Sequence, residues 1–369
     1  MKYFIIAGEV SGDLHASKLV SAIRKEEPWA QLRGWGGDEM KKAGTKILKH
    51  INELAFMGFS EVIANLGTIL SNFKTVKKQI KEFDPDVLVL VDYPGFNMRI
   101  AKWAKKQGFK VYYYIAPQAW AWKAGRVKKL IRDVDEMYII LPFEKPWFEK
   151  RGLRVNYFGH PLMDSDILDE RDRKDFLRRN DLPDQEIIAM LPGSRKQELK
   201  RMESVFLELP SEFPEFKFVV AGAPSRKLAD YQSYLDHSIS VVFDQTYDLL
   251  HAANYAMVTS GTATLETALI GTPFMVCYKT SPGTYFMAKR VVKVPYIALA
   301  NLIAGKKIVE EFIQSQCSPE TLGNELRQLM HGKNEQQIKD FQELRKNLKD
   351  KGVSRRIAGD MIGKLVATA

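Results

Sequence analysis

The sequence predicts an α/β protein made of two doubly wound, Rossmann-like domains followed by a helical C-terminus. Three observations lead to this fold class. Short apolar runs rich in Val, Ile and Tyr alternate with helical patterns, which is typical of βαβ units and parallel sheets. The alternation stops in a charged stretch near residues 165–185 and then begins again. Finally, 369 residues are more than one hydrophobic core normally serves.

The first domain is expected over residues 1–164. Each of its apolar runs is followed by a helical pattern or by a turn, and the run FGHPLMD ends the domain with a Gly-His-Pro turn. In chain order the expected elements are strand 2–7, helix 16–25, strand 86–91, helix 98–107, strand 110–115, helix 125–131 and strands 136–140 and 154–158.

The second domain is expected over residues 165–340. Its predicted strands are 186–191, 217–221, 239–243, 255–258 and 274–278, with helices between them such as 204–209 and 247–252. From Pro319 onward the chain is charged throughout and holds no apolar strand run, so a helical tail is predicted. We expect residues 341–369 to pack back on an N-terminal domain, either of the same chain or of a partner.

The bulk composition excludes several classes of protein. A hydrophobic content of 45% with 27% charged residues is typical of a folded soluble protein. Cys277 and Cys317 give neither a disulfide framework nor metal-ligand spacing, which favours a reducing cytoplasmic location. The apolar run at the N-terminus is too short for a secretory signal. A net charge of +10 predicts attraction to polyanions, but no nucleic-acid motif accompanies it.

Residues 54–73 are a mostly apolar stretch with one charge, Glu61, followed by the basic run 74–81. Polar residues around the stretch argue against a transmembrane span. Two interpretations stay open: an amphipathic helix at an anionic membrane surface, or a helix that faces the core.

Polar loops that follow strands are the first places to seek a site, because ligands bind at the carboxyl ends of parallel strands. In the first domain, the loop AGEVSGD after strand 2–7 carries Glu9, Ser11, Gly12 and Asp13, although Asp13 could simply cap a helix. The loop VDYPGFN places Asp92 at the end of an apolar strand. A carboxylate there is a candidate general base, and Asn97 could cap the next helix.

Two loops of the second domain predict phosphate binding. LPGSR supplies Gly193, Ser194 and Arg195 at a helix start, and a guanidinium binds phosphate through two hydrogen bonds. TSGTATLE places Ser260, Gly261 and Thr262 at a helix N-terminus, where free N–H groups attract a diphosphate. Glu266 lies one helical turn beyond Thr262 and could reach a ribose diol. Ordinary helix caps remain an alternative for both loops.

Other known motifs are missing. The chain has no G-x-G-x-x-G fingerprint, no P-loop lysine and no G-x-S-x-G elbow. Asp-x-Asp occurs at 84–86, 133–135 and 164–166, either before a strand or in charged stretches, so no metal and no cofactor are predicted.

Eight motifs taken together resemble the lipid-A-disaccharide synthase family. In chain order they are AGEVSGD, VDYPGFN, YYIAPQAWAW, LPFE, GHPLMD, LPGSR, SGTATLE and ALANLIAG, and they extend from residue 7 to about 310. The resemblance implies a GT-B glycosyltransferase whose two domains face a cleft. It also implies an inverting reaction that joins UDP-2,3-diacylglucosamine to 2,3-diacylglucosamine 1-phosphate (lipid X), giving a β-1,6 tetraacyl disaccharide 1-phosphate and UDP.

The resemblance also implies roles for residues. Asp92 would take the proton of the acceptor hydroxyl, Arg195 would bind the donor diphosphate, and Asn301 in NLIAG would lie near the nucleotide. The loop that holds Glu9 and Asp13 would line the acceptor side. Further implications are a peripheral position on the cytoplasmic face of a bacterial inner membrane and homodimers with exchanged C-terminal segments.

Competing functions stay open at this point. The nearest is another UDP-sugar glycosyltransferase of the same architecture with a different lipid acceptor. A UDP-sugar epimerase shares the fold but needs acid and base groups around the sugar C2. A basic, membrane-associated scaffold would tolerate replacement of Asp92 and Arg195.

Overall fold

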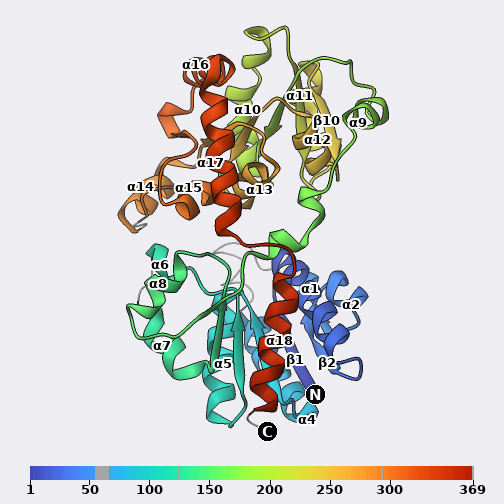
Figure 1. Ribbon diagram of the computed structural model, residues 1–369, viewed down its shortest axis with the longest axis vertical. Coiled ribbons are helices and arrows are strands. Elements are labelled where there is room, and N and C mark those ends of the chain that lie inside the picture. Colours follow the sequence, from blue (N-terminus) through green and yellow to red (C-terminus); the bar gives the residue numbers. More distant parts are fainter. Residues whose placement is uncertain (55–65, 123–124, 292–293, 368–369) are drawn as a thin grey trace. The chain divides into compact units, whose positions relative to one another are not determined.

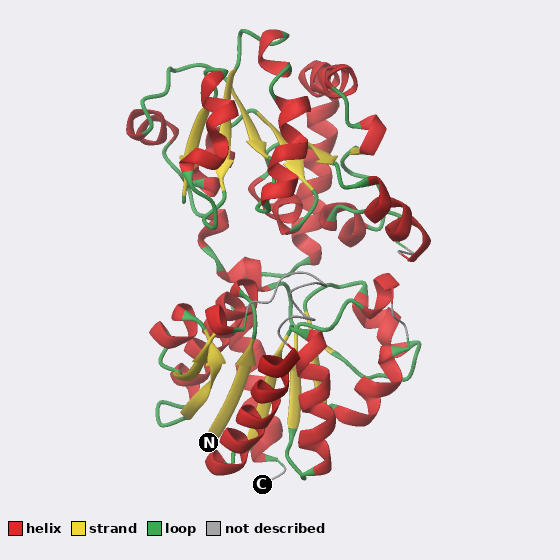
Figure 2. Ribbon diagram, turned by 180° about the vertical axis from the view of Figure 1, so that it is seen from behind, coloured by secondary structure: helices red, strands yellow, loops and turns green. Residues whose placement is uncertain are grey.

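The computed structural model describes residues 1–54, 66–122, 125–291 and 294–367. The chain forms two compact units. The first unit comprises Met1–Asp164 and Lys349–Ala369, and the second comprises Ser165–Leu348. In each unit a parallel sheet lies between layers of helices (Figure 2).

The first unit is built on a seven-stranded sheet of order β3-β2-β1-β4-β5-β6-β7. Its strands are β1 Lys2–Ala7, β2 Gln31–Gly36, β3 Lys46–His50, β4 Val87–Val91, β5 Val111–Tyr114, β6 Glu136–Ile139 and β7 Asn156–Tyr157. Its helices are α1 Val10–Glu26, α2 Asp38–Lys42, α4 Leu66–Phe83, α5 Pro94–Lys106, α6 Ala119–Trp122, α7 Arg126–Asp133, α8 Glu144–Glu149 and α18 Val353–Val366, with short 3₁₀ turns η1 Ile51–Glu53 and η2 Pro161–Asp164.

The second unit is built on a six-stranded sheet of order β10-β9-β8-β11-β12-β13. Its strands are β8 Ile187–Leu191, β9 Lys217–Gly222, β10 Ser240–Phe243, β11 Tyr255–Thr259, β12 Phe274–Tyr278 and β13 Glu311–Ile313. Its helices are α9 Arg173–Arg179, α10 Lys196–Phe206, α11 Gln232–Asp236, α12 Thr246–Ala252, α13 Thr262–Ile270, α14 Pro282–Val291, α15 Leu299–Ala304, α16 Pro319–Gln328 and α17 Asn334–Asn347. The short turns are η3 Asp166–Leu168, η4 Leu209–Ser211, η5 Leu228–Tyr231, η6 Gln314–Gln316 and the kinked η7 Leu329–Lys333.

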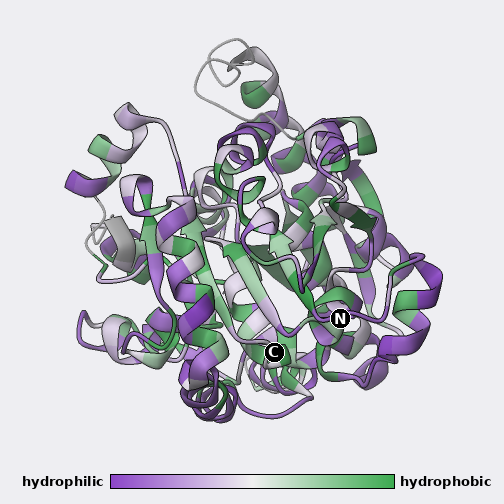
Figure 3. Ribbon diagram, turned by 90° about the horizontal axis from the view of Figure 1, so that it is seen from above, coloured by the Kyte–Doolittle hydropathy of each residue, from purple (hydrophilic) through white to green (hydrophobic). Residues whose placement is uncertain are grey.

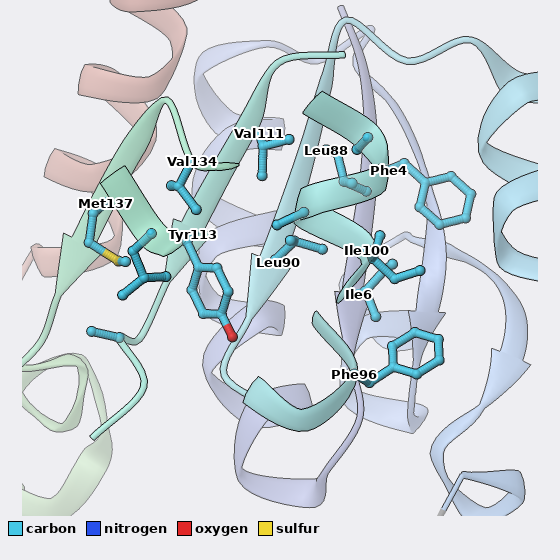
Figure 4. Close-up of a cluster of buried hydrophobic side chains, with 14 of the residues drawn as sticks. Phe4, Ile6, Leu88, Leu90, Phe96, Ile100, Val111, Tyr113, Val134 and Met137 are labelled. Atoms are coloured by element: carbon cyan, nitrogen blue, oxygen red, sulfur yellow. The ribbon is translucent and has the colours of Figure 1, made fainter. Parts of the chain in front are cut away.

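Each unit has its own hydrophobic core between sheet and helices. In the first unit, side chains of β1, β4 and β5 converge with those of α5, as Figure 4 shows for Phe4, Leu90, Ile100 and Tyr113. All residues of β4 are buried, as expected for a central strand covered on both faces. The strands are accordingly mostly apolar while the outer helices mix polar and apolar residues (Figure 3). In the second unit both cysteines are free and buried in the core.

The C-terminal helix α18 belongs to the first unit. It packs against α1 (Figure 1). Asp164 holds its start, because the carboxylate accepts hydrogen bonds from the backbone N–H groups of Gly352, Val353 and Ser354 at 2.6–2.9 Å. The chain returns to the first unit after Leu348, whereas the sequence predicted this break between 340 and 341. The difference arises because α17 continues as one helix to Asn347.

The predicted fold class is confirmed, but three strands were missed: β2, β3 and β13. The pattern of β2 is interrupted by Arg33 and Gly34, and a Cβ at Gly34 would lie 1.8 Å from the carbonyl oxygen of Ile5 in the neighbouring strand. β3 and β13 are half-exposed edge strands without an apolar run. Their positions therefore depend on pairing rather than on hydrophobic pattern.

The question of a membrane contact falls mainly on residues 55–65, which lie outside the described part of the chain. The basic continuation is described, and it forms α4. Among the described residues, no helix combines the length and apolar character needed to cross a bilayer.

Candidate active site

The two sheets change strand order at equivalent places. In the first sheet, β1 leads outward through β2 to β3 while β4 begins the opposite direction. In the second sheet, β8 and β11 are related in the same way. Such switch points leave a crevice at the carboxyl ends of the adjoining strands, where α/β proteins bind ligands. The four loops selected from the sequence follow these four strands.

The main chain of Asp92, directly after β4, is held in an unusual conformation. Asp92 and Tyr93 have φ values of 45° and 47°, in the left-handed region that few residues other than Gly, Asn and Asp adopt. The Asp92 carbonyl oxygen accepts hydrogen bonds from the Tyr113 hydroxyl at 2.7 Å and from the Asn97 amide at 2.9 Å. Backbone strain of this kind persists only where surrounding contacts offset it, and it is concentrated at functional sites.

The sequence predicted that Asn97 could cap the next helix, but the structure places this residue inside α5. α5 begins at Pro94, which fits the first helical position because proline lacks an N–H. The fully buried Asn97 amide also donates to the carbonyl oxygens of Ile6 and Val91. Asn97 therefore links the ends of β1 and β4 at the switch point.

The loops after β1 and β4 touch through Gly8. A Cβ at this position would lie 2.3–2.6 Å from ring atoms of Tyr93, a distance that no real contact tolerates. The glycine lets the backbone of the AGEVSGD loop lie directly on the Tyr93 ring, which in turn fixes the residue after Asp92.

We expect Gly8→Ala to lower activity by displacing Tyr93 and with it Asp92. Overpacking of this kind costs about 1–3 kcal/mol of stability. A thermal melt and the turnover rate would be measured together. Gly95→Ala is the matched control, since a Cβ there meets nothing within 4 Å. A Gly8→Ala variant with unchanged turnover would contradict the role given to this contact.

The Asp92 carboxyl has a raised pKa. Burial raises its pKa to about 6, and the charge of Glu9 also raises it, whereas a hydrogen bond from the Tyr93 backbone lowers it. A base with a pKa near the working pH is effective in proton transfer. Glu9 itself is exposed at the cap of α1, and exposed Ser11 follows in the first turn.

A second carboxyl near Asp92 was missed by sequence reasoning. Glu144, the last residue of LPFE, is 1% exposed and accepts hydrogen bonds from the Trp120 indole at 2.9 Å and the Leu141 backbone at 3.1 Å. Burial is the main cause that raises its pKa to about 7 despite these bonds, and the Asp92 charge contributes to the rise. The available signal was a carboxylate just after a strand. Its hydrogen bonds join Trp120 to Leu141, which follows β6.

Asp13 was predicted to line the acceptor side, but the structure gives it a different role. Its carboxylate is buried and accepts hydrogen bonds from the backbone N–H groups of Gly37, Glu39 and Met40 at 2.7–3.1 Å. Asp13 therefore holds the first turn of α2, a helix other than its own. Gly12 is also buried, inside the first turn of α1. Glu9 and Ser11 remain as the exposed predicted residues of this loop.

His15 and His160 lie near each other in the first unit. Burial is the main cause that lowers the pKa of His15 to about 4 and the pKa of His160 to about 3. The positive charge of Lys18 contributes to both shifts. His160 Nδ1 accepts a hydrogen bond from the Leu162 backbone. Both imidazoles are thus neutral at pH 7.

In the second unit, the loop after β8 presents Arg195 to solvent. Gly193 has a φ of 102°, and a Cβ there would lie 2.7 Å from Glu198 Oε2, so glycine is required. Glu198 accepts hydrogen bonds from the Arg195 backbone N–H at 3.2 Å and from its guanidinium at 3.0 Å. Ser194 is exposed beside it, and the Arg195 side chain is 73% exposed. The guanidinium is free to exchange Glu198 for a ligand.

The loop after β11 leads into α13, and the first N–H groups of a helix have no partner four residues back. Within this first turn the Thr264 backbone N–H donates to the Gly261 carbonyl oxygen at 3.2 Å. Gly261 and Thr262 are exposed there. The Ser260 hydroxyl instead donates to the carbonyl oxygen of Ile297 at 3.0 Å. Glu266 accepts a hydrogen bond from the Tyr247 hydroxyl at 2.9 Å, and burial raises its pKa. Among the described residues, the Thr259 hydroxyl is buried at this strand end without a partner.

Asn301 was predicted to lie near the nucleotide, and in the structure its amide is occupied by hydrogen bonds within the second unit. Its fully buried amide accepts hydrogen bonds from the Ile308 and Val309 backbone N–H groups and donates to Val309 and Glu311. Glu311 also accepts from the Ile297 and Ala298 backbones. The pair holds the segment that contacts Ser260. The burial that forces these bonds leaves the amide no capacity for a ligand.

No group of three or more His, Cys, Asp or Glu side chains able to hold a metal ion occurs in the described ranges.

Comparison with known proteins identifies relatives over the whole chain. The family model described as lipid-A-disaccharide synthetase matches residues 3–360. The lipid-A-disaccharide synthase of Geobacter metallireducens is 38% identical over 376 residues, covering 98% of each chain. That of Trichlorobacter lovleyi is 39% identical over 370 residues, covering 97% of this chain and 96% of its own.

Solved structures share the fold at low identity. UDP-GlcNAc 2-epimerase from Neisseria meningitidis, bound to UDP-GlcNAc, superimposes with a TM-score of 0.60 at 13% identity over 100% of both chains. The glycotransferase of kitacinnamycin does so with a TM-score of 0.66 at 12% identity, covering 99% of this chain and 98% of its own. At these identities the likeness establishes the two-domain GT-B architecture alone.

Proposed function

This chain belongs to the lipid-A-disaccharide synthase family of glycosyltransferases, and from that premise we propose that it is the inverting enzyme of lipid A biosynthesis that joins two acylated glucosamines. The donor is UDP-2,3-diacylglucosamine and the acceptor is lipid X. The products are the β-1,6-linked tetraacyl disaccharide 1-phosphate and UDP.

The observation that carries the proposal is Asp92. Inversion requires one displacement, in which the acceptor 6-hydroxyl attacks the anomeric carbon and loses its proton. Asp92 offers a carboxylate with a pKa of about 6 at the switch point of the first sheet. The Asp92 carbonyl oxygen is held by hydrogen bonds from Asn97 and Tyr113. The Asp92 carboxylate is the group proposed to accept the proton. Glu9 and Ser11, exposed on the adjoining loop, are the proposed sugar contacts.

The second unit supplies the proposed donor site. Arg195 and the N-terminus of α13 at Gly261 and Thr262 bind the diphosphate, and Glu266 accepts hydrogen bonds from the ribose. Preorganised donors of this kind stabilise the charge that develops on a departing diphosphate. Support comes from the exposed Arg195 guanidinium and from the buried, unpartnered Thr259 hydroxyl among the described residues.

Two further parts of the proposal concern partners. The net charge of +10 and the lysines of α4 (Lys74, Lys77, Lys78 and Lys81) support binding to the anionic cytoplasmic face of an inner membrane. A homodimer with exchanged C-terminal segments stays a prediction, since α18 packs on the first unit of its own chain.

The test is UDP release from UDP-2,3-diacylglucosamine with and without lipid X, in EDTA, with the lipid product identified by mass. The proposal expects release that depends on lipid X and yields the tetraacyl disaccharide 1-phosphate. UDP binding without turnover on lipid X would move the function to another acceptor. Interconversion of the donor sugar without lipid X would instead indicate an epimerase.

We expect kcat/KM to fall with an apparent pKa near 6 as the pH is lowered. The reason is that a general base must be ionised, and the Asp92 carboxyl gains its proton as the pH falls through that value. Glu9→Gln removes a charge that raises this pKa, so the acid limb should move to lower pH. Glu26→Gln, an exposed change elsewhere on α1, is the control and should leave the limb in place. An acid limb unmoved in Glu9→Gln would contradict the assignment to Asp92.

A further inference from the structure

The loop after β9 lies beside the loop that carries Arg195. β8 and β9 are parallel neighbours whose register pairs Met190 with Val220, so both strands end at the same edge of the second sheet. The loop after β9 has the sequence Ala-Pro-Ser-Arg-Lys over residues 223–227. A hydrogen bond of 3.4 Å from the Ser225 hydroxyl to the Ser194 carbonyl oxygen links it directly to LPGSR.

This loop is well fixed at its base. The Ala223 backbone N–H donates to the hydroxyl of Tyr231, which is fully buried, at 2.8 Å. The Arg226 N–H closes the turn by donating to the Ala223 carbonyl oxygen at 2.9 Å. Asp230 accepts from the Lys227 backbone N–H at 3.1 Å and so holds the start of η5. The backbone of Arg226 is therefore positioned before any ligand arrives.

Among the residues that the structure describes, the Arg226 side chain has an unused hydrogen-bond donor. It is half-buried, and within the described residues it forms no ion pair, while its Nε is buried without a hydrogen-bond partner. Its positive charge is felt at the Tyr231 hydroxyl, which places it against the base of the loop. Burying an N–H of a charged group without a partner is costly, and an anion is the ligand that would satisfy both this donor and the charge.

The charges of the donor site leave room for a second cation. Each phosphate of a nucleoside diphosphate sugar is negatively charged, and further negative charge develops when the diphosphate leaves. Arg195 supplies one positive charge, and Glu198 lies 3.0 Å from its guanidinium. The N-terminus of α13 supplies only about half an elementary charge. A second guanidinium would complete the neutralisation.

We infer that Arg226 is a second binding residue for the diphosphate of the nucleotide donor, brought to Arg195 by the hydrogen bond between Ser225 and Ser194. The inference rests on the proposed function, because it assumes that a nucleoside diphosphate binds at this switch point. It assigns Arg226 to the donor site, a residue that neither the sequence motifs nor the resemblance singled out.

The test compares binding of UDP and of uridine by calorimetry in the full-length chain. Arg226→Gln should weaken UDP binding by about tenfold or more, since charge-assisted hydrogen bonds to phosphate are strong. Uridine binding should change less than about twofold. Arg226→Lys should restore part of the loss, as it keeps the charge without the planar fork. Lys227→Gln, its exposed neighbour, is the matched control and should bind UDP like the wild type.

The outcomes separate this inference from the proposed function. A wild-type chain that binds no UDP would contradict both the proposed function and the inference. A wild type that binds UDP, an Arg195→Gln variant that loses it and an Arg226→Gln variant within twofold of wild type would overturn the inference alone. An equal loss of uridine and UDP binding in Arg226→Gln would overturn it as well, because that pattern reports a deformed site rather than a lost phosphate contact.

Discussion

Replacing Asp92 with Asn is expected to reduce kcat by about 10²–10⁴-fold, the range typical for loss of a general base. Asn is the sharpest substitution because it keeps the size of the side chain and tolerates the left-handed φ of 45° at this position. Ala would add backbone strain to the chemical loss. The measurement is single-turnover UDP release with saturating lipid X.

The variant carries its own folding control. The Asp92 pKa is about 6 in the folded protein and higher than the ordinary value of 3.8, so stability falls as the pH rises between these two values, and the full cost of ionising the carboxyl is present above about pH 6. A neutral amide removes that cost. We therefore expect Asp92→Asn to melt no lower than the wild type at pH 8. A folded variant with near-normal turnover would show that Asp92 is not the base.

Replacing Arg195 with Gln is expected to lower kcat/KM by about 10²–10³-fold, as for loss of one donor to a developing negative charge. Both kcat and the donor KM should change, because the diphosphate is bound in the ground state and gains charge as it leaves. Steady-state kinetics with varied donor would separate the two effects.

The fold should be unaffected, since the exposed pair between Arg195 and Glu198 contributes only about 0–1 kcal/mol. Lys200→Gln, an exposed change one turn further along α10, is the matched control and should stay within about twofold of wild type. Arg195→Lys should recover part of the activity. Unchanged kinetics in Arg195→Gln would show that the Arg195 guanidinium does not bind the donor.

The sequence by itself determined the two-domain α/β class and the loops that carry chemistry. Central strands such as β4 are buried on both faces, so they must be continuous apolar runs, and such runs can be recognised without a structure. The resemblance to a family rested on eight motifs in order, and the relatives confirm it. Edge strands such as β3 carry no such pattern, which is why they were missed.

Only the tertiary structure decided which polar side chains of those loops are available to bind a ligand. Asp13 was predicted to line the acceptor side and Asn301 to lie near the nucleotide. Both side chains are buried, so their polar atoms must be satisfied, and backbone groups of other segments satisfy them. Glu144 and Arg226 were recognised as candidate site residues only in the structure, because separate strands of a sheet end at the same edge and bring their loops together. Hydrogen-bond partners and burial are properties of neighbours in space, and a linear pattern does not specify them.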